Sequence, residues 1–246
     1  MFTYEQIRQM NDLEIMIYNY VISNGEEVAG MTIRELAQQL HVSSTTILRF
    51  CAKVGCEGYS EFKYRLRTFL KEKQTADTEV DYTFIQDFFA RVKDSDLNES
   101  IHRVAEIVYR KERVFFIGIG TSGTLGKYGA RYLSNLGKSS FYLDDPFHPT
   151  ENGNYDDTVV VALSVSGEQR FLYKQIDGLK KGKATIVSIT NTKQCTLASI
   201  SDYNIAYYIP MRVLAGGYNV TSSIPVVYIL EKLAHEVHRL LEEQEG

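Results

Sequence analysis

Two loops rich in serine, threonine and glycine carry groups that could hold an anion. The first, residues 118–123, reads Gly-Ile-Gly-Thr-Ser-Gly and directly follows the apolar run 114–117. The second, residues 164–168, reads Ser-Val-Ser-Gly-Glu and directly follows the apolar run 158–163. Small residues let backbone N–H groups approach a phosphate closely, and the hydroxyls add hydrogen-bond donors. The residue types therefore point to the binding of a phosphate group.

The elements around these loops alternate between strand and helix from residue 114 onward. We expect strands at residues 114–119, 139–143, 158–164, 184–190 and 204–209, and helices at residues 122–136, 167–180, 193–201 and 223–243. This alternation predicts βαβ units and a doubly wound parallel sheet sandwiched between helices. Ligands of such sheets bind outside the carboxyl ends of the strands, where helix N-termini add free N–H groups. The sequence thus predicts a phosphorylated small molecule across two strand ends.

A second constellation lies in the helical first third of the chain. A helix over residues 32–40 begins with Thr32 and Glu35 at capping-box spacing, and a three-residue turn separates it from a helix over residues 44–53 that stops before Gly55. This geometry matches a helix-turn-helix, whose second helix reads the major groove of DNA. The side chains left on its polar side are Ser44, Thr45, Thr46, Arg49 and Lys53. Hydroxyls with one Arg and one Lys suit mixed contacts to bases and phosphates.

Charge is divided unevenly along the chain. The 246 residues carry a net charge of −4, yet residues 49–75 hold seven basic and three acidic groups and so carry +4. A local basic segment suits a small phosphate-contacting surface. The sequence has no apolar run near the roughly 18 residues that span a bilayer, no signal-peptide pattern, and three cysteines without zinc or disulfide spacing. We expect a cytoplasmic protein without membrane segment, metal or cofactor.

The recognition-helix region carries a longer motif. Paired Ser/Thr residues precede Arg49-Phe50, and residues 53–63 read Lys-Val-Gly-Cys-Glu-Gly-Tyr-Ser-Glu-Phe-Lys. This run closely resembles the N-terminal domain of RpiR-type (MurR/RpiR) transcriptional regulators. The resemblance implies DNA contact by Ser44, Thr45, Thr46, Arg49 and Lys53, with Lys63 as a further candidate for the phosphate backbone.

The second half of the chain resembles a sugar isomerase (SIS) domain, the partner module of the same regulators. The matching elements are Gly118-x-Gly120-x-Ser122, Ser164-x-Ser166-Gly167, Ile189-Thr190-Asn191, and Ser222 at the start of the last helix. The resemblance implies a phosphosugar site formed by Gly120, Thr121, Ser122, Ser164, Ser166, Gly167, Gln169, Thr190 and Ser222. Within it, Ser122, Ser164, Ser166 and the backbone of Gly167 would hold the phosphate. Two departures stand out: Gln169 replaces the usual Thr, and Ser223 replaces the Arg that commonly follows Ser222.

Together these patterns predict a helix-turn-helix DNA-binding domain over residues 1–75, a linker and connecting helix over 76–96, and a SIS phosphosugar-binding domain over 97–246. We expect a transcriptional regulator that represses carbohydrate-metabolism genes and has no catalytic residue. It would bind a palindromic double-stranded DNA operator as a homodimer or tetramer and respond to a sugar phosphate. An aldose–ketose sugar-phosphate isomerase is the main alternative, because these loops also suit an enzyme. A plain phosphosugar-binding adaptor is the third.

Overall fold

The computed structural model describes residues 1–75, 83–92, 96–145, 147–151, 153–214 and 218–245. Residues 76–82 and 93–95 of the expected linker lie outside these ranges. The chain divides into two compact units. The helical unit comprises Met1–Phe84 and Tyr208–Ser222, and the sheet unit comprises Ile85–Tyr207 and Ser223–Gly246.

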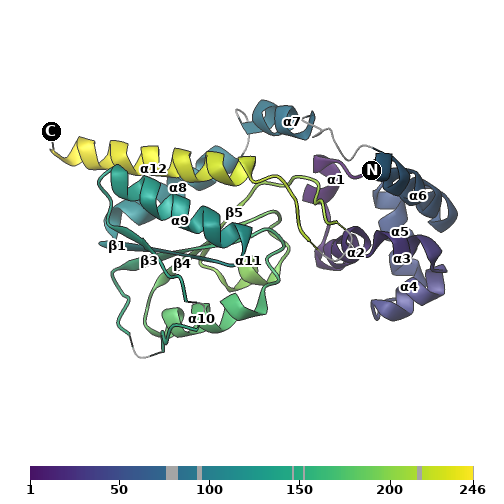
Figure 1. The fold of residues 1–246 in the computed structure, drawn as a ribbon, viewed down its shortest axis with the longest axis horizontal. Helices are drawn as coiled ribbons and strands as arrows, with labels where there is room; N and C mark the ends of the chain where they lie inside the picture. Colours follow the sequence, from purple (N-terminus) through teal and green to yellow (C-terminus); the bar gives the residue numbers. More distant parts are fainter. Residues whose placement is uncertain (76–82, 93–95, 146, 152, 215–217, 246) are drawn as a thin grey trace. The chain divides into compact units, whose positions relative to one another are not determined.

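Helices α1 to α6 make up most of the helical unit (Figure 1). Their bounds are α1 Tyr4–Arg8, α2 Asp12–Ser23, α3 Gly25–Gly30, α4 Ile33–Gln39, α5 Ser44–Lys53 and α6 Tyr59–Thr75. Capping boxes begin α1, α2 and α4, and the box at Thr32 and Glu35 is the one predicted. The predicted helices are confirmed, whereas α1 and α3 were not foreseen because one or two turns offer too few apolar repeats to recognise.

The core of the helical unit gathers the apolar face of α5. Ile47, Phe50 and Cys51 are buried, on the side of α5 away from the predicted polar residues. The ring of Phe50 meets that of Phe62 edge-on, with centroids 5.7 Å apart. Burying this face fixes the opposite side of α5 toward solvent.

The sheet unit contains five parallel strands in the order β2-β1-β3-β4-β5. Their bounds are β1 Arg113–Gly118, β2 Ser140–Tyr142, β3 Thr158–Ser164, β4 Thr185–Thr190 and β5 Tyr203–Ala206. All five predicted strands are present. The last one ends earlier than the expected residue 209, because Tyr208 adopts φ +48° and turns the chain out of the extended conformation.

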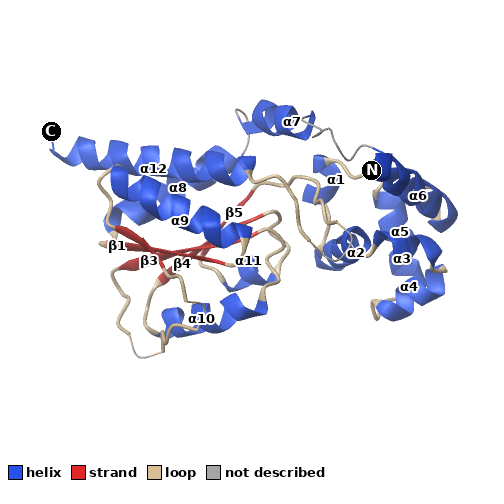
Figure 2. Cartoon of the chain, viewed as in Figure 1, coloured by secondary structure: helices blue, strands red, loops and turns tan. Residues whose placement is uncertain are grey.

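Helices cover the sheet on both faces (Figure 2), as predicted for a doubly wound domain. The boundary between the two units falls within α7, Thr83–Val92. The helices that follow are α8 Asp96–Arg110, α9 Thr121–Asn135, α10 Arg170–Lys181, α11 Thr196–Ile200 and α12 Ile224–Glu245. On one face α12 packs against α8 and α9. On the other, α10 and α11 share a core with β3 and β4. None of the helices in the described ranges is long and apolar enough to cross a membrane.

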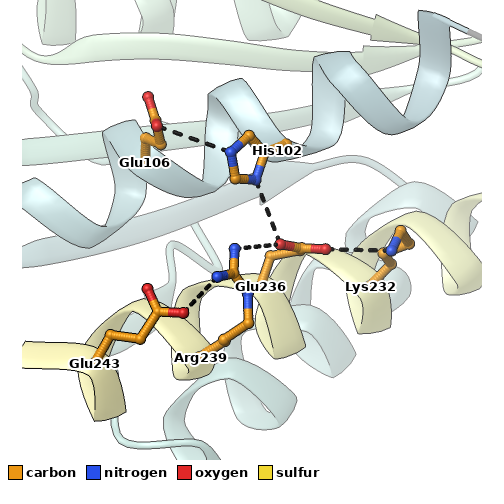
Figure 3. Close-up of polar contacts among 6 residues, drawn as sticks. All are labelled: His102, Glu106, Lys232, Glu236, Arg239 and Glu243. Atoms are coloured by element: carbon orange, nitrogen blue, oxygen red, sulfur yellow. Dashed lines mark hydrogen bonds and ion pairs between the residues drawn. The ribbon is translucent and has the colours of Figure 1, made fainter. Parts of the chain in front are cut away.

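A network of charges joins α8 to α12 (Figure 3). The carboxylate of Glu236 accepts from Arg239 at 3.1 Å and from Lys232 at 3.2 Å, and lies 3.4 Å from Nδ1 of His102. Burial opposes ionisation of Glu236, but these hydrogen bonds outweigh it and lower the pKa of its carboxyl group. The network fastens the two helices at the surface of the sheet unit.

Candidate functional site

The first serine loop links β1 to α9. Gly120 precedes α9 with φ +60° and offers no side-chain cap, so the first N–H groups of α9 keep no partner within the helix. Within the described part of the chain, the hydroxyls of Thr121 and Ser122 make no hydrogen bond. The hydroxyl of Tyr142 donates to the carbonyl of Gly118 at 2.8 Å and holds the loop from β2. The loop thus presents free donors at a strand end.

The second serine loop folds on its own hydroxyls. The Oγ of Ser164 accepts the N–H of Gly167 at 3.1 Å, and the Oγ of Ser166 accepts the N–H of Glu168 at 3.3 Å. A hydroxyl that accepts a backbone N–H still has its own hydrogen to donate. Both side chains can therefore shape the loop and donate to an anion at once.

Three side chains clamp the second loop, and we call them the loop clamp: Glu168, Tyr173 and Thr196. Both carboxylate oxygens of Glu168 accept from Thr196, one from the backbone N–H at 2.9 Å and the other from the hydroxyl at 2.7 Å. The hydroxyl of Tyr173 lies 2.8 Å from the carbonyl of Gly167 and 3.1 Å from Glu168. Burial raises the pKa of Tyr173 to about 12, so this hydroxyl keeps its proton. Sequence reasoning missed the clamp because Thr196 lies far along the chain.

Gly167 is required by its surroundings. Its φ is +70°, and a Cβ added there would lie 2.2 Å from the Sγ of Cys195. Cys195 is buried and free, and burial raises the pKa of its thiol. Only glycine allows this conformation and this close approach.

The remaining predicted ligand residues differ in availability. Thr190 is buried, and its hydroxyl donates to the carbonyl of Thr192 at 2.7 Å and accepts from Asn204 at 2.8 Å. Its hydrogen is therefore already used within the fold. Gln169 is exposed at the start of α10 without a capping bond. Ser222 falls in the stretch grouped with the helical unit.

Strand pairing brings the two serine loops to neighbouring strand ends. In the register of β1 and β3, Gly118 pairs with Leu163, so both chains leave the sheet at the same level. Ser164 in turn pairs with Thr190 of β4. The carboxyl edge of the sheet thus gathers hydroxyls and helix N–H groups, an arrangement suited to holding an oxyanion.

The helix-turn-helix is α4, a turn and α5. Ser43 caps α5 by accepting the N–H of Thr46 at 3.1 Å, and its hydroxyl lies 2.9 Å from that of Thr46. Thr45 and Arg49 are exposed, whereas Ser44 and Thr46 are half-buried. In the described part of the chain, the guanidinium of Arg49 makes no hydrogen bond or ion pair. Arg49 is thus available to a partner on the outer side of α5.

Both of the predicted DNA-contacting lysines are engaged within the fold. The ammonium of Lys53 lies 3.1 Å from the carboxylate of Glu14 in α2. Lys63 donates to the carbonyl of Met31 at 2.8 Å, at the end of α3. The motif marked both as contacts, but the partners that hold them come from distant segments, which no local pattern reveals.

Comparisons with known proteins identify both units. A family model described as "Helix-turn-helix domain, rpiR family" matches residues 4–73, and one for the SIS domain matches residues 107–234. An uncharacterized HTH-type transcriptional regulator of Clostridium perfringens is 23% identical over 241 residues, which cover 91% of this chain and 86% of that protein.

Two further likenesses differ in extent. A "Bifunctional protein glk" of Paraburkholderia xenovorans is 23% identical over 273 residues, and this chain spans only 42% of its length. The solved structure of the Vibrio vulnificus NanR protein complexed with ManNAc-6P has a TM-score of 0.57 and 23% identity, covering 96% of this chain and 90% of that one. At this identity the likeness establishes the fold.

Proposed function

The chain belongs to the SIS-domain family and carries a helix-turn-helix domain of the rpiR family, and we propose that it is a phosphosugar-controlled repressor of carbohydrate-metabolism genes. It would act in the cytoplasm, binding a palindromic operator as a homodimer or tetramer. In a dimer, two copies of α5 would enter successive major grooves, so the operator would share the two-fold symmetry of the protein.

One observation carries the phosphosugar part of the proposal. The two serine loops begin at the ends of adjacent, in-register strands, as the pairing of Gly118 with Leu163 requires. The hydroxyls of Ser122, Ser164 and Ser166, with the first N–H groups of α9, would hold the phosphate. The sugar would extend toward the exposed amide of Gln169.

The DNA part rests on the outer side of α5. Arg49 would contact bases or phosphates, with Thr45 beside it at the N-terminal half of the helix. Lys53 and Lys63 would contact DNA only if Glu14 and the carbonyl of Met31 release them. While they remain paired, they would support DNA binding by holding α5 and α6 in place. Such phosphate contacts weaken steeply as salt rises.

Sugar binding controls DNA binding only if the sugar prefers one arrangement of the protein. A preference of about 1.4 kcal/mol would give tenfold regulation. The position of Glu168 favours this binding role over catalysis. Both of its oxygens are occupied by Thr196, so the carboxylate in the second loop is not poised as a general base for an isomerase.

A thermal-shift panel tests the proposal on the full chain. The panel contains ManNAc-6P, the ligand of the NanR structure, with glucose 6-phosphate, arabinose 5-phosphate and inorganic phosphate. We expect one sugar phosphate to raise the melting temperature and to change the affinity for a duplex that the protein selects from a random-sequence library. The same samples are assayed for aldose–ketose conversion. Turnover, or no stabilisation by any phosphate, would reject a sensory role.

A further inference from the structure

The segment between β5 and α12 is flanked in sequence by parts of the sheet unit, but it is part of the helical unit. We call residues 208–222 the β5–α12 segment. The chain leaves the sheet unit after Tyr207 and re-enters it at Ser223, yet Tyr208–Ser222 forms one compact body with Met1–Phe84. Figure 1 shows the segment beside α2. The helical unit is therefore assembled from two distant stretches of chain.

Buried contacts fasten this segment to α1 and α2. The backbone N–H of Met211 donates to the hydroxyl oxygen of Tyr18 at 2.8 Å, and both residues are buried. The ring of Tyr208 meets that of Tyr4 edge-on at 5.8 Å. Burial also raises the pKa of Tyr18, so its hydroxyl stays neutral. These are interior contacts, and their loss would leave a buried N–H group without a partner.

The described parts of the segment, residues 208–214 and 218–222, are bonded to each other. The N–H of Arg212 donates to the hydroxyl of Thr221 at 2.9 Å, and the N–H of Val220 donates to the carbonyl of Arg212 at 2.8 Å. The outgoing and returning parts of the chain are thereby joined close to Met211. A displacement of either part is thus transmitted to the other.

From Tyr18, a continuous set of contacts reaches the recognition helix. The ring of Phe2 lies 4.9 Å from that of Tyr18 and 6.3 Å from that of Phe50 in α5. One turn before Tyr18, Glu14 binds Lys53 of α5 at 3.1 Å. Helix α2 therefore contacts the β5–α12 segment through one residue and α5 through another.

The N-terminal end of the β5–α12 segment follows a residue that contacts the candidate phosphosugar site. The N–H of Tyr207 donates to the carbonyl of Thr190 at 3.2 Å, at the carboxyl end of β4. The segment begins at the next residue and ends at Ser222. Both Thr190 and Ser222 belong to the predicted ligand set. A ligand that shifts either of them moves an end of the segment.

We propose that the β5–α12 segment transmits phosphosugar binding to α5 through Met211 and Tyr18. The inference rests on the proposed function and adds the route by which the two binding activities are coupled. Tyr18 acts here as a positioning residue, because it lies in neither the DNA surface nor the serine loops. Removing its hydroxyl should weaken the coupling and leave each binding activity in place.

The test compares Tyr18→Phe with the control Tyr64→Phe in the full chain. Tyr64 lies in α6 of the same unit and is 71% exposed. For each protein we measure the affinity for the panel's strongest stabiliser, and the affinity for the library-selected duplex with and without that sugar phosphate. We expect Tyr18→Phe to reduce the sugar-induced change in DNA affinity about fivefold, the scale of one hydrogen bond, with both separate affinities within about twofold of the wild type.

A second measurement keeps the inference falsifiable if Tyr18→Phe is poorly folded. Hydrogen exchange of the wild-type chain should show that the sugar phosphate changes protection in residues 12–23 and 208–214. Full coupling in Tyr18→Phe, or unchanged exchange in both stretches while DNA affinity changes, would overturn the role of the segment alone. A wild-type chain that binds no sugar phosphate would overturn the proposed function and this inference together.

Discussion

In the proposed function, the recognition helix and the second serine loop would both bind a phosphate, and they are built for it in opposite ways. Around α5, contact and support fall to different residues. In the described part of the chain Arg49 has no partner and is available for contact, while Lys53 is paired with Glu14 and helps to hold the helix. In the loop, one hydroxyl would do both tasks, because Ser164 accepts the N–H of Gly167 and still has its own hydrogen to donate.

This difference predicts how each region responds to mutation. Contact and support should separate cleanly at α5, where different side chains carry them. In the loop they should be lost together, unless the substitution touches only the loop clamp or the packing behind the loop. Five substitutions distinguish these cases, and the first has the largest expected effect.

Gly167→Ala should abolish the loop. The added Cβ would meet Cys195 at 2.2 Å in a left-handed conformation, so we expect at least about a hundredfold loss of phosphosugar affinity and about 2–4 kcal/mol of lost stability. Titration calorimetry and thermal melting measure the two effects. The control is Gly30→Ala, where nothing lies within 4 Å of the added Cβ. An unaltered affinity in Gly167→Ala would contradict the role of the loop.

Arg49→Ala should weaken DNA binding by about 1–3 kcal/mol, roughly 5- to 150-fold, because the free guanidinium is lost. Phosphosugar affinity and melting temperature should stay as in the wild type. The measurement is fluorescence anisotropy with the library-selected duplex, and the control is Arg103→Ala, an exposed arginine of α8 paired with Glu99. Equal losses in both variants would remove α5 from the DNA surface.

Lys53→Met should separate support from contact. Because Lys53 is paired with Glu14, we expect a loss of about 0.5–1 kcal/mol in stability, and the same loss should not recur when Lys53→Met is added to Glu14→Gln. Chemical unfolding of the four proteins gives the coupling. If Lys53→Met instead leaves stability unchanged and weakens DNA binding as much as Arg49→Ala does, Lys53 is a direct contact.

Tyr173→Phe probes the loop clamp without touching the serines. The substitution removes the hydroxyl that contacts the carbonyl of Gly167 and the carboxylate of Glu168. Phosphosugar affinity should therefore fall about three- to tenfold, the value of one hydrogen bond. DNA affinity in the absence of sugar should be unaffected. The matched control is Tyr203→Phe in β5. A loss shared by both variants would show that the clamp does not position the loop.

Glu236→Gln measures the stability contributed by a contact that lies in neither the phosphosugar site nor the DNA surface. Since the folded pKa of Glu236 is lowered below its ordinary value of 4.5, its stabilising effect is present above that pH and is lost as pH falls through the folded pKa. The wild type should therefore melt a few degrees higher than the variant at about pH 6 and match it near pH 3. A difference in melting temperature that grows as the pH falls would contradict a stabilising role for the ionised Glu236.

Sequence patterns predicted the elements well where the signal is local. The capping box at Thr32 and the apolar strands before each serine loop specify their elements within a few residues. Partners were not predictable: Glu14 for Lys53, Met31 for Lys63 and Thr196 for Glu168 all lie on other elements. Such pairings depend on how helices pack, and a motif gives residue types without that information.

Because Met211 contacts Tyr18 and Tyr208 contacts Tyr4, exchanging the helix-turn-helix domain between relatives cannot be done at one junction. A hybrid joined only near residue 84 would pair a foreign Tyr18 with the resident β5–α12 segment. Grafting residues 1–84 together with 208–222 as a matched set should preserve solubility and cooperative melting. Protein engineers who wish to exchange the helix-turn-helix domain therefore need to transplant two pieces.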